Sequence, residues 1–221
     1  MASLYLYVVA RDFGFAPNPF HGYCTLATCK PGIRNTASIG DWIFGVGGGR
    51  LKATGRCIYA MKVTQKVSFD EYWNNPIYKD KKPVRNGSKK MLIGDNIYHQ
   101  DKKNNWIQAH SHHSNIDGTT EYTNLRRDTK SPFVLISEHF YYFGSAAPKI
   151  PEELLANLPF ENRVGHRRYD LERGKDIIDW LKHDYSNNLN LVLADPFDFD
   201  QSDAHYSFET NLVTTVLFNG T

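Results

Sequence analysis

The segment HSHH, which begins at His110, places three imidazole side chains within four residues. If this segment is a β-strand, His110 and His112 point to the same face and His113 points to the other. Two imidazoles on one face can bind a transition metal, provided that His99 or Asp95 supplies a third ligand. The same side chains can instead contact a ligand through hydrogen bonds, or form a structural or solvated cluster. The sequence leaves these three alternatives open.

Lys30 is a second residue whose surroundings suggest chemistry. The hydroxyls of Thr25 and Thr28 lie close to it in the sequence, and Glu71 can supply a carboxylate. A desolvated lysine beside a hydroxyl and a carboxylate can hydrolyse an amide. Such a set acts only if the fold brings its members together. Arg34, which precedes a Gly-Asp turn, is better suited to donate to an anion or a carbonyl group.

Aromatic residues make up 14% of the chain. This content favours an aromatic core, and it also suits surfaces that stack planar ligands such as bases. Residues 13–49 are rich in aromatic rings, and two prolines there hold Asn18, whose amide can both donate and accept. We therefore expect residues 13–49 to form the floor and rim of a ligand pocket. The segments GDNIY (94–98) and WIQAHSHHS (106–114) are expected to meet it there, with Gln108 contacting a base edge or a polar ring.

These patterns define one expected pocket. No residue is assigned a catalytic role, although Lys30 and His110 are candidates, and no metal or cofactor is expected. The chain contains no nucleophile elbow, HExxH segment, paired-aspartate metal motif or phosphate loop, so the sequence favours binding over catalysis. The expected ligand-binding residues are Asn18, Phe20, Tyr23, Thr25, Lys30, Arg34, Trp42, Asp95, Asn96, Tyr98, Gln108, His110 and His112.

The elements that position these residues are mostly strands. The predicted strands are residues 4–10, 41–47, 56–65 and 133–143, of which the second and third form a hairpin. Ser68 and Glu71 predict a capped helix over residues 68–74, and an amphipathic pattern predicts another over residues 172–185. Strands that dominate the first two thirds, punctuated by helices, predict an α+β fold whose mostly antiparallel sheet is curved or closed.

The 221 residues are expected to form a single domain, 1–221. Residues 75–105 are rich in Lys, Asn, Asp and Gly and are predicted to be an insertion that runs over the surface. Residues 151–221 are predicted to be a helical C-terminal extension. It ends in a late strand or a partner-facing segment at residues 211–218, and a homo-oligomer is a further possibility.

The formal net charge of the chain is +2, so it is not a strong polyelectrolyte. This balance permits contact with nucleic acid without requiring it. Basic residues cluster in the segment KDKKPVRNGSKK (79–90), which is either a solvated loop or a phosphate-binding segment. The expected phosphate contacts are Lys79, Lys81, Lys82, Arg85, Lys89 and Lys90.

The sequence also indicates a cellular compartment. Residues 1–3 lead directly into a strand pattern, so no signal peptide is expected. No apolar run approaches the roughly 18 residues of a membrane span. The three cysteines are odd in number and are not spaced as metal ligands, which fits reduced thiols. We therefore expect a cytoplasmic protein with no membrane contact.

Several short segments follow one another between Arg11 and Gly144: FGFAPNPFHGYCTLATCKPGIR, GDWIFGVG, IYAMKV, FDEYW, GDNIY and WIQAHSHHS. In their order and in their residues they resemble the motifs of the nucleotide modification associated domain 2 family, found largely in phages and bacteria. The resemblance implies a role near modified nucleotides, in DNA modification or defence. If the chain is phage-encoded, it implies the host cytoplasm as the location.

A second resemblance concerns architecture. The strand that begins at Gly40, the strand 58–63 and the helix 69–73 resemble the layout of PUA-like barrels such as the EVE, ASCH and YTH domains. This resemblance implies a small β-barrel with peripheral helices, around a pocket that holds a modified base or nucleotide. It places residues 18–34 at the pocket and Trp42 near its wall. Some ASCH-type members are amidohydrolases that use Lys, Thr and Glu, a set that this chain matches only loosely.

We therefore expect a binding module that recognises a modified base, a nucleotide or a nucleotide-derived signal. Its expected partner is a nucleotide or a modified nucleic acid. A pocket too closed for a polymer would favour a free nucleotide, which a phage could sequester as a host defence signal. The alternative is an enzyme that acts on a modified base or nucleotide, either amidohydrolase-like or metal-assisted. A third possibility is a structural or interaction protein whose special residues only shape a filled barrel.

Overall fold

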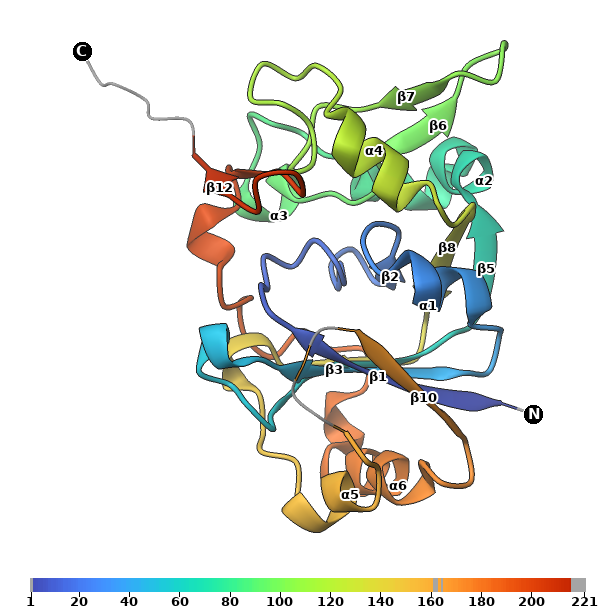
Figure 1. The fold of residues 1–221 in the computed structure, drawn as a ribbon, viewed down its shortest axis with the longest axis vertical. Helices are drawn as coiled ribbons and strands as arrows, with labels where there is room; N and C mark the ends of the chain where they lie inside the picture. Colours follow the sequence, from blue (N-terminus) through green and yellow to red (C-terminus); the bar gives the residue numbers. More distant parts are fainter. Residues whose placement is uncertain (1, 161–162, 164, 216–221) are drawn as a thin grey trace.

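The computed structural model describes residues 2–160, 163 and 165–215, and its centre is a five-stranded sheet (Figure 1). In order across the sheet, the strands are β10 (His166–Asp170), β1 (Ser3–Val9), β3 (Trp42–Gly47), β4 (Cys57–Lys62) and β9 (Phe140–Tyr142). Strands β1 and β3 are parallel, and the other neighbours are antiparallel. The central strands are buried along nearly their whole length because both faces of the sheet are covered.

Two helices cover the face of this sheet that lies at the bottom of Figure 1. They are α5 (Glu152–Ala156) and α6 (Lys175–Asp184). Helix α6 buries Ile177, Ile178 and Leu181 in the core that surrounds the sheet. The amphipathic helix predicted over residues 172–185 is therefore confirmed, with shorter bounds.

Smaller elements cover the opposite face (Figure 1). The small sheets are β2–β8–β5 (Cys24–Leu26, Phe133–Ser137, Gln65–Ser68), β6–β7 (Tyr98–Gln100, Trp106–Gln108) and β11–β12 (His205–Tyr206, Val213–Thr214). The other α-helices are α1 (Pro31–Thr36), α2 (Phe69–Asn74), α3 (Lys89–Leu92) and α4 (Tyr122–Asp128). Short 3₁₀ helices span Gly49–Leu51, Pro76–Lys81, Gly144–Ala146, Ser186–Asn188 and Phe199–Gln201.

The prediction of a curved or closed, PUA-like β-barrel is wrong. The fold is α+β, but its strands form several small sheets, and the five-stranded sheet ends in two edge strands, β10 and β9. The chain leaves this sheet after β4 and pairs β5 with β8 in a separate sheet. The parallel pairing of β1 with β3 also interrupts the antiparallel order that a hairpin-built barrel would need.

Two local predictions are confirmed. Strands β3 and β4 pair as an antiparallel hairpin. Helix α2 begins with a capping box, in which the Ser68 hydroxyl accepts from the backbone N–H of Glu71 at 3.1 Å and the Glu71 carboxylate accepts from the backbone N–H of Ser68 at 2.7 Å.

The structure contains two apolar cores. The first surrounds the five-stranded sheet and includes Tyr7 and Val9 at the end of β1. The second lies among the smaller sheets and includes Phe13 and Phe15. Because only a few residues separate these two pairs in the sequence, the chain passes from one core to the other directly after β1.

The predicted surface insertion and the predicted C-terminal extension both take part in the main fold. Residues 75–105 supply Ile93 and Tyr98 to the second core, and β10, from residues 151–221, pairs with β1. Within the predicted strand 211–218 the structure has β12, and residues 216–218 lie outside the described residues. In the described part of the chain, no helix has the length and apolar character needed to cross a membrane.

Candidate functional site

A cavity of about 160 Å³ lies at the boundary between the two cores. Phe13 and Phe15, in the loop after β1, form one aromatic side of it, and Tyr206 and Phe208 contribute rings from near the end of the chain. The volume is below the roughly 300 Å³ at which pockets for drug-sized ligands begin. The cavity therefore suits one ring system rather than an extended molecule.

Two arginines and one lysine line the same cavity. The Lys30 ammonium lies 4.3 Å from the centroid of the Tyr7 ring, and the Arg127 guanidinium lies 3.7 Å from that of Phe208. The third, Arg11, donates to Asn211. Within the part of the chain that the structure describes, none of the three forms an ion pair with a carboxylate. The rim of the cavity is therefore electropositive.

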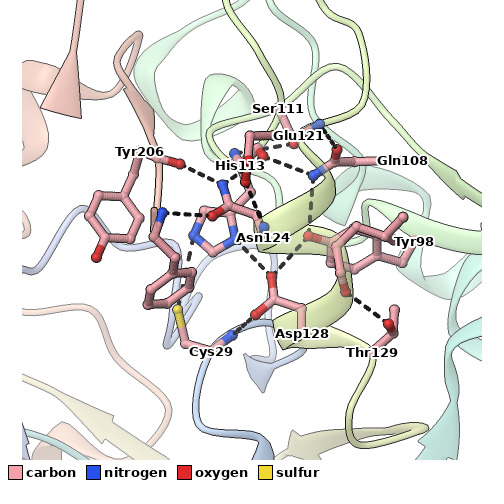
Figure 2. Close-up of polar contacts among 12 residues, drawn as sticks. Cys29, Tyr98, Gln108, Ser111, His113, Glu121, Asn124, Asp128, Thr129 and Tyr206 are labelled. Carbon is pink, nitrogen blue, oxygen red and sulfur yellow. Dashed lines mark hydrogen bonds and ion pairs between the residues drawn. The ribbon is translucent and has the colours of Figure 1, made fainter. Parts of the chain in front are cut away.

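At the base of the cavity, a thiol, an imidazole and a carboxylate stand in a row (Figure 2). Nδ1 of His113 lies 2.7 Å from Oδ2 of Asp128, and Nε2 of the same ring lies 4.0 Å from Sγ of Cys29. The side chains of His113 and Asp128 are buried, whereas Cys29 is partly exposed and lines the cavity with His113. Two segments far apart in the sequence thus meet here.

The imidazole and the carboxylate form a buried ion pair. Burial is the largest single influence on the pKa of His113 and lowers it, but the charge and hydrogen bond of Asp128, together with Cys29, outweigh burial and raise this pKa to about 10. Burial opposes ionisation of Asp128 as well, yet the charges of His113 and Arg34 hold its pKa below the ordinary value. At neutral pH the pair is therefore imidazolium and carboxylate.

The backbone at Cys29 is held in an unusual conformation. Cys29 and Lys30 both have left-handed backbones, with φ of 55° and 39°, directly before helix α1. Non-glycine residues adopt this conformation only when surrounding contacts enforce it. The N–H of Cys29 donates to Oδ1 of Asp128 at 2.7 Å, and its carbonyl accepts from Nε of Arg34 at 2.8 Å. These bonds fix the position of the thiol.

Other polar side chains orient the His113 end of the row (Figure 2). The carbonyl of His113 accepts from Nε2 of Gln108 and from Nδ2 of Asn124, each at 2.8 Å. The hydroxyl of Tyr98 donates to Oδ2 of Asp128 at 2.9 Å. Gln108 and Tyr98, both expected to contact a ligand, thus support the His113–Asp128 pair from behind.

The histidine segment does not lie on a strand. Strand β7 ends at Gln108, and the following residues form turns, so the condition under which His110 and His112 would share a strand face is not met. His110 is exposed and stacks on His205. His112 lines the cavity, and burial lowers its pKa well below the usual value, so it is neutral. No group of three or more His, Cys, Asp or Glu in the described residues is placed to hold a metal ion.

A second buried polar cluster gathers four of the expected ligand-binding residues around Lys81. The amine of Lys81 donates to the carbonyl and side-chain oxygens of Asn18, to the carbonyl of Tyr23 and to the hydroxyl of Thr25. Thr25 in turn donates to Asp95 at 2.6 Å. Burial lowers the pKa of Lys81 to about 8, against the opposing charge of Asp95. The donors and acceptors of this network bond to one another within the protein, and they hold residues 13–30 in place.

The remaining expected residues lie mainly in the interior. Among the expected ligand-binding residues, Lys30 and His112 line the cavity. Phe20 and Trp42 are buried in the cores, and Asn96 donates to the carbonyl of Tyr72. The proposed Lys-Thr-Glu set does not assemble around Lys30, because Glu71 is engaged at the surface in the cap of α2.

The six expected phosphate contacts have different environments. Lys81 is buried and its amine is fully engaged, so it cannot reach a phosphate outside the protein. Arg85 donates to the carbonyl of Leu92, and Lys89 pairs with Asp200. Of the others, Lys82 lies over the Trp73 ring, Lys90 lies 5.6 Å from the ring centroid of Phe20, and Lys79 is exposed.

A family model, nucleotide modification associated domain 2, matches residues 1–203. The chain belongs to this family. A search of curated proteins and a search of solved structures both find no match. Membership places the protein in the context of nucleic-acid modification, and it leaves open whether the family member binds or transforms its ligand.

In this nucleotide modification associated domain, sequence reasoning missed Cys29, His113 and Asp128 as one group. Cys29 and His113 lay inside stretches already expected at the pocket, next to Lys30 and His112. Asp128 lies at the end of α4 within a polar segment and has no local motif that singles it out. The carboxylate could have been found only from the fold.

Proposed function

We propose that the cavity binds a nucleotide or a modified nucleobase, with the base against the aromatic walls and the phosphate at the cationic rim. The single observation that carries this proposal is the combination, in one cavity, of the Phe13–Phe15 rings with two arginines and a lysine that no carboxylate of the described residues neutralises. Aromatic rings stack on any base because every base has a π-face. Arginine and lysine donors match phosphate oxygens in charge and geometry.

The size of the cavity narrows the ligand. At about 160 Å³ it accepts one base-sized group, so sugar and phosphate would remain at the rim beside Arg11 and Arg127. A free nucleotide fits this arrangement directly, whereas a polymer would have to extrude a base to reach the same position. We therefore propose the free nucleotide as the ligand. Location in the cytoplasm, a phage origin, a role against host defence and homo-oligomerisation stay predictions.

A second candidate function has its own support. The row of Cys29, His113 and Asp128 at the base of the cavity favours the alternative in which the bound nucleotide is transformed. Binding and transformation make different demands on these residues, so they can be tested separately.

The test of binding is isothermal titration calorimetry of the full chain with a panel of natural and modified nucleoside monophosphates. Arg127→Gln removes a cation from the rim, and Arg126→Gln removes its neighbour on α4, which is exposed and does not line the cavity. We expect Arg127→Gln to weaken binding about tenfold or more, because a hydrogen bond to a charged group is lost. Arg126→Gln should leave the affinity unchanged.

Two further comparisons sharpen this test. A nucleoside without its phosphate should bind more weakly and should not distinguish the two variants. Added salt should weaken binding of the monophosphate through screening of the rim charges. If no nucleotide binds, or if both arginine variants behave alike, the pocket has been assigned to the wrong ligand.

A further inference from the structure

The row at the base of the cavity has the parts of a nucleophilic site. Cys29 is partly exposed and lines the cavity, Nε2 of His113 lies 4.0 Å from its Sγ, and Asp128 holds the other ring nitrogen at 2.7 Å. A nucleophile, a base within reach of it and a third group that orients the base are the general signature of covalent catalysis. Contacts between nucleophile and base commonly shorten when substrate binds.

The other two cysteines provide an internal contrast. Cys24 and Cys57 are buried in the first core, where burial raises the pKa of both thiols, so they behave as inert packing residues. Cys29 differs in exposure and in its surroundings. The charged groups near it include His113, Lys30, Asp128 and Arg34.

Two positively charged groups lie near the Cys29 thiol. His113 carries a positive charge through its pairing with Asp128, and Lys30 adds another beside the cavity. A thiolate is the nucleophilic form of cysteine, and positive neighbours stabilise it. The carboxylate of Asp128 contacts the imidazole through Oδ2 and the backbone N–H of Cys29 through Oδ1.

We propose that Cys29 is the nucleophile, His113 the general acid–base and Asp128 the positioning residue of a hydrolase site for an amide or ester carbonyl carried by a nucleotide. The nucleotide part of this substrate class rests on the proposed function above. The acyl part follows from the Cys29–His113 geometry, which places a proton donor beside the nucleophile, where a leaving nitrogen or oxygen needs one.

The reaction balances with water as the only co-reactant. The thiolate of Cys29 attacks the carbonyl carbon, and an Sγ–C bond forms as the carbonyl π electrons move to oxygen. When this intermediate collapses, the bond from carbon to the leaving nitrogen or oxygen breaks, and Nε2 of His113 gives its proton to the leaving group. Neutral His113 then takes a proton from water, the hydroxide attacks the thioester, and the thiolate leaves. The products are a carboxylic acid and the amine or alcohol.

The test uses 4-nitrophenyl acetate as an acyl donor with the full chain, followed by peptide mass mapping. We expect Cys29 to acquire the acetyl group at least about tenfold faster than free cysteine in the same buffer. Cys24 and Cys57 should remain unmodified. Acetylation of Cys29 no faster than free cysteine would overturn the proposal, and this comparison requires no variant that could fail to fold.

A pair of histidine variants tests the acid–base. His113→Gln should lower the rate of Cys29 acetylation and of deacetylation by about 100-fold. His110→Gln, which alters an exposed histidine of the same segment, should leave both rates unchanged. If His113→Gln retains the wild-type circular dichroism spectrum and reacts as fast as wild type, His113 has no catalytic role.

N4-acetyldeoxycytidine monophosphate, a nucleotide that carries an amide carbonyl, tests the proposed binding and the proposed hydrolysis together. Wild type should release deoxycytidine monophosphate and acetate, whereas Cys29→Ser should bind the compound in calorimetry without turnover. Binding without turnover or acetylation in wild type would refute the hydrolase site and keep the proposed function. Rapid acetylation by 4-nitrophenyl acetate without any nucleotide binding would keep the thiol site and refute the proposed function.

Discussion

The backbone N–H of Cys29 donates a 2.7 Å hydrogen bond to Oδ1 of Asp128, although 99 residues separate the two in the chain. The other carboxylate oxygen, Oδ2, holds the imidazole of His113. One carboxylate therefore sets the position of both the thiol and the ring that faces it. This shared anchor explains why a partly exposed loop can hold two left-handed residues in succession.

Asp128→Asn should destabilise the protein in a pH-dependent way. Breaking a buried ion pair by removing one partner costs about 3–5 kcal/mol of unfolding free energy. The folded-state pKa of His113 is raised from 6.5 to about 10, so its contribution is fully present below about pH 6.5 and is lost as pH rises through about 10. The contribution of Asp128, whose pKa is lowered, is lost only in acid, as pH falls through that lowered value.

Urea denaturation of wild type and Asp128→Asn across this pH range measures the effect. The difference in unfolding free energy should be largest below about pH 6.5, above the acid limit, and should shrink toward pH 10. The other groups that face the pair are Tyr98, Arg34 and Cys29. Asp179→Asn, at an exposed position on α6, should show no such trend. A difference that does not change with pH would contradict the ion pair.

Lys30→Gln should weaken nucleotide binding about tenfold, because it removes a rim cation while keeping most of the side-chain length. Lys102→Gln removes an exposed lysine outside the cavity and serves as the matched control. Calorimetry at two salt concentrations checks the origin of the loss. The difference in nucleotide affinity between Lys30→Gln and Lys102→Gln should become smaller at the higher salt concentration. Equal affinities at low salt would exclude Lys30 from phosphate recognition.

Lys81→Met should unfold the protein more easily without changing nucleotide affinity. It removes the donor shared by oxygens of Asn18, Tyr23 and Thr25, all inside the protein. Leaving buried acceptors unpaired costs about 1–3 kcal/mol for each group. Thermal unfolding and calorimetry of Lys81→Met and of the exposed control Lys79→Met separate these effects. Lost nucleotide binding in a folded Lys81→Met protein would reassign this lysine to the ligand.

Ser68→Ala should cost about 1 kcal/mol of unfolding free energy, because the N-cap hydroxyl of α2 accepts from the N–H of Glu71. Ser88 is the N-cap of α3 and has no side-chain capping bond. Ser88→Ala should therefore change stability by only a few tenths of a kcal/mol. Denaturant unfolding of the two variants measures how much the Ser68 cap contributes to the unfolding free energy. Equal losses of unfolding free energy in both variants would contradict a stabilising cap at Ser68.

Local patterns predicted the elements well where one short segment carries the whole signal. Alternation in residues 41–47 and 56–65 was enough for the β3–β4 hairpin, and the Ser68–Glu71 spacing was enough for the cap of α2. The prediction of the sheet arrangement failed because the sequence of one strand does not specify its partner, as in the pairs β1–β3 and β5–β8. The hairpin was predicted correctly, but the barrel that we expected around it does not form because the other strands pair differently.

The candidate site shows the same division. The stretch around Lys30 and the histidine segment were both expected at a pocket, and both reach it. Their internal geometry could not be predicted, because β7 ends at Gln108 and the turns that follow bring His112 and His113, but not His110, to the cavity. Asp128 could not be predicted either, since its role depends on contacts with residues 15 and 99 positions away.

The end of the family match at residue 203 divides the cavity in two. Cys29, His113 and Asp128 lie within the matched residues, whereas Tyr206 and Phe208 lie beyond them and are tied back by Asn124, whose side-chain oxygen accepts from the N–H of Phe208 at 2.9 Å. The row of Cys29, His113 and Asp128 and the wall that covers it thus fall on opposite sides of the end of the family match. We expect changes at Tyr206 and Phe208 alone to alter which ligand the cavity accepts.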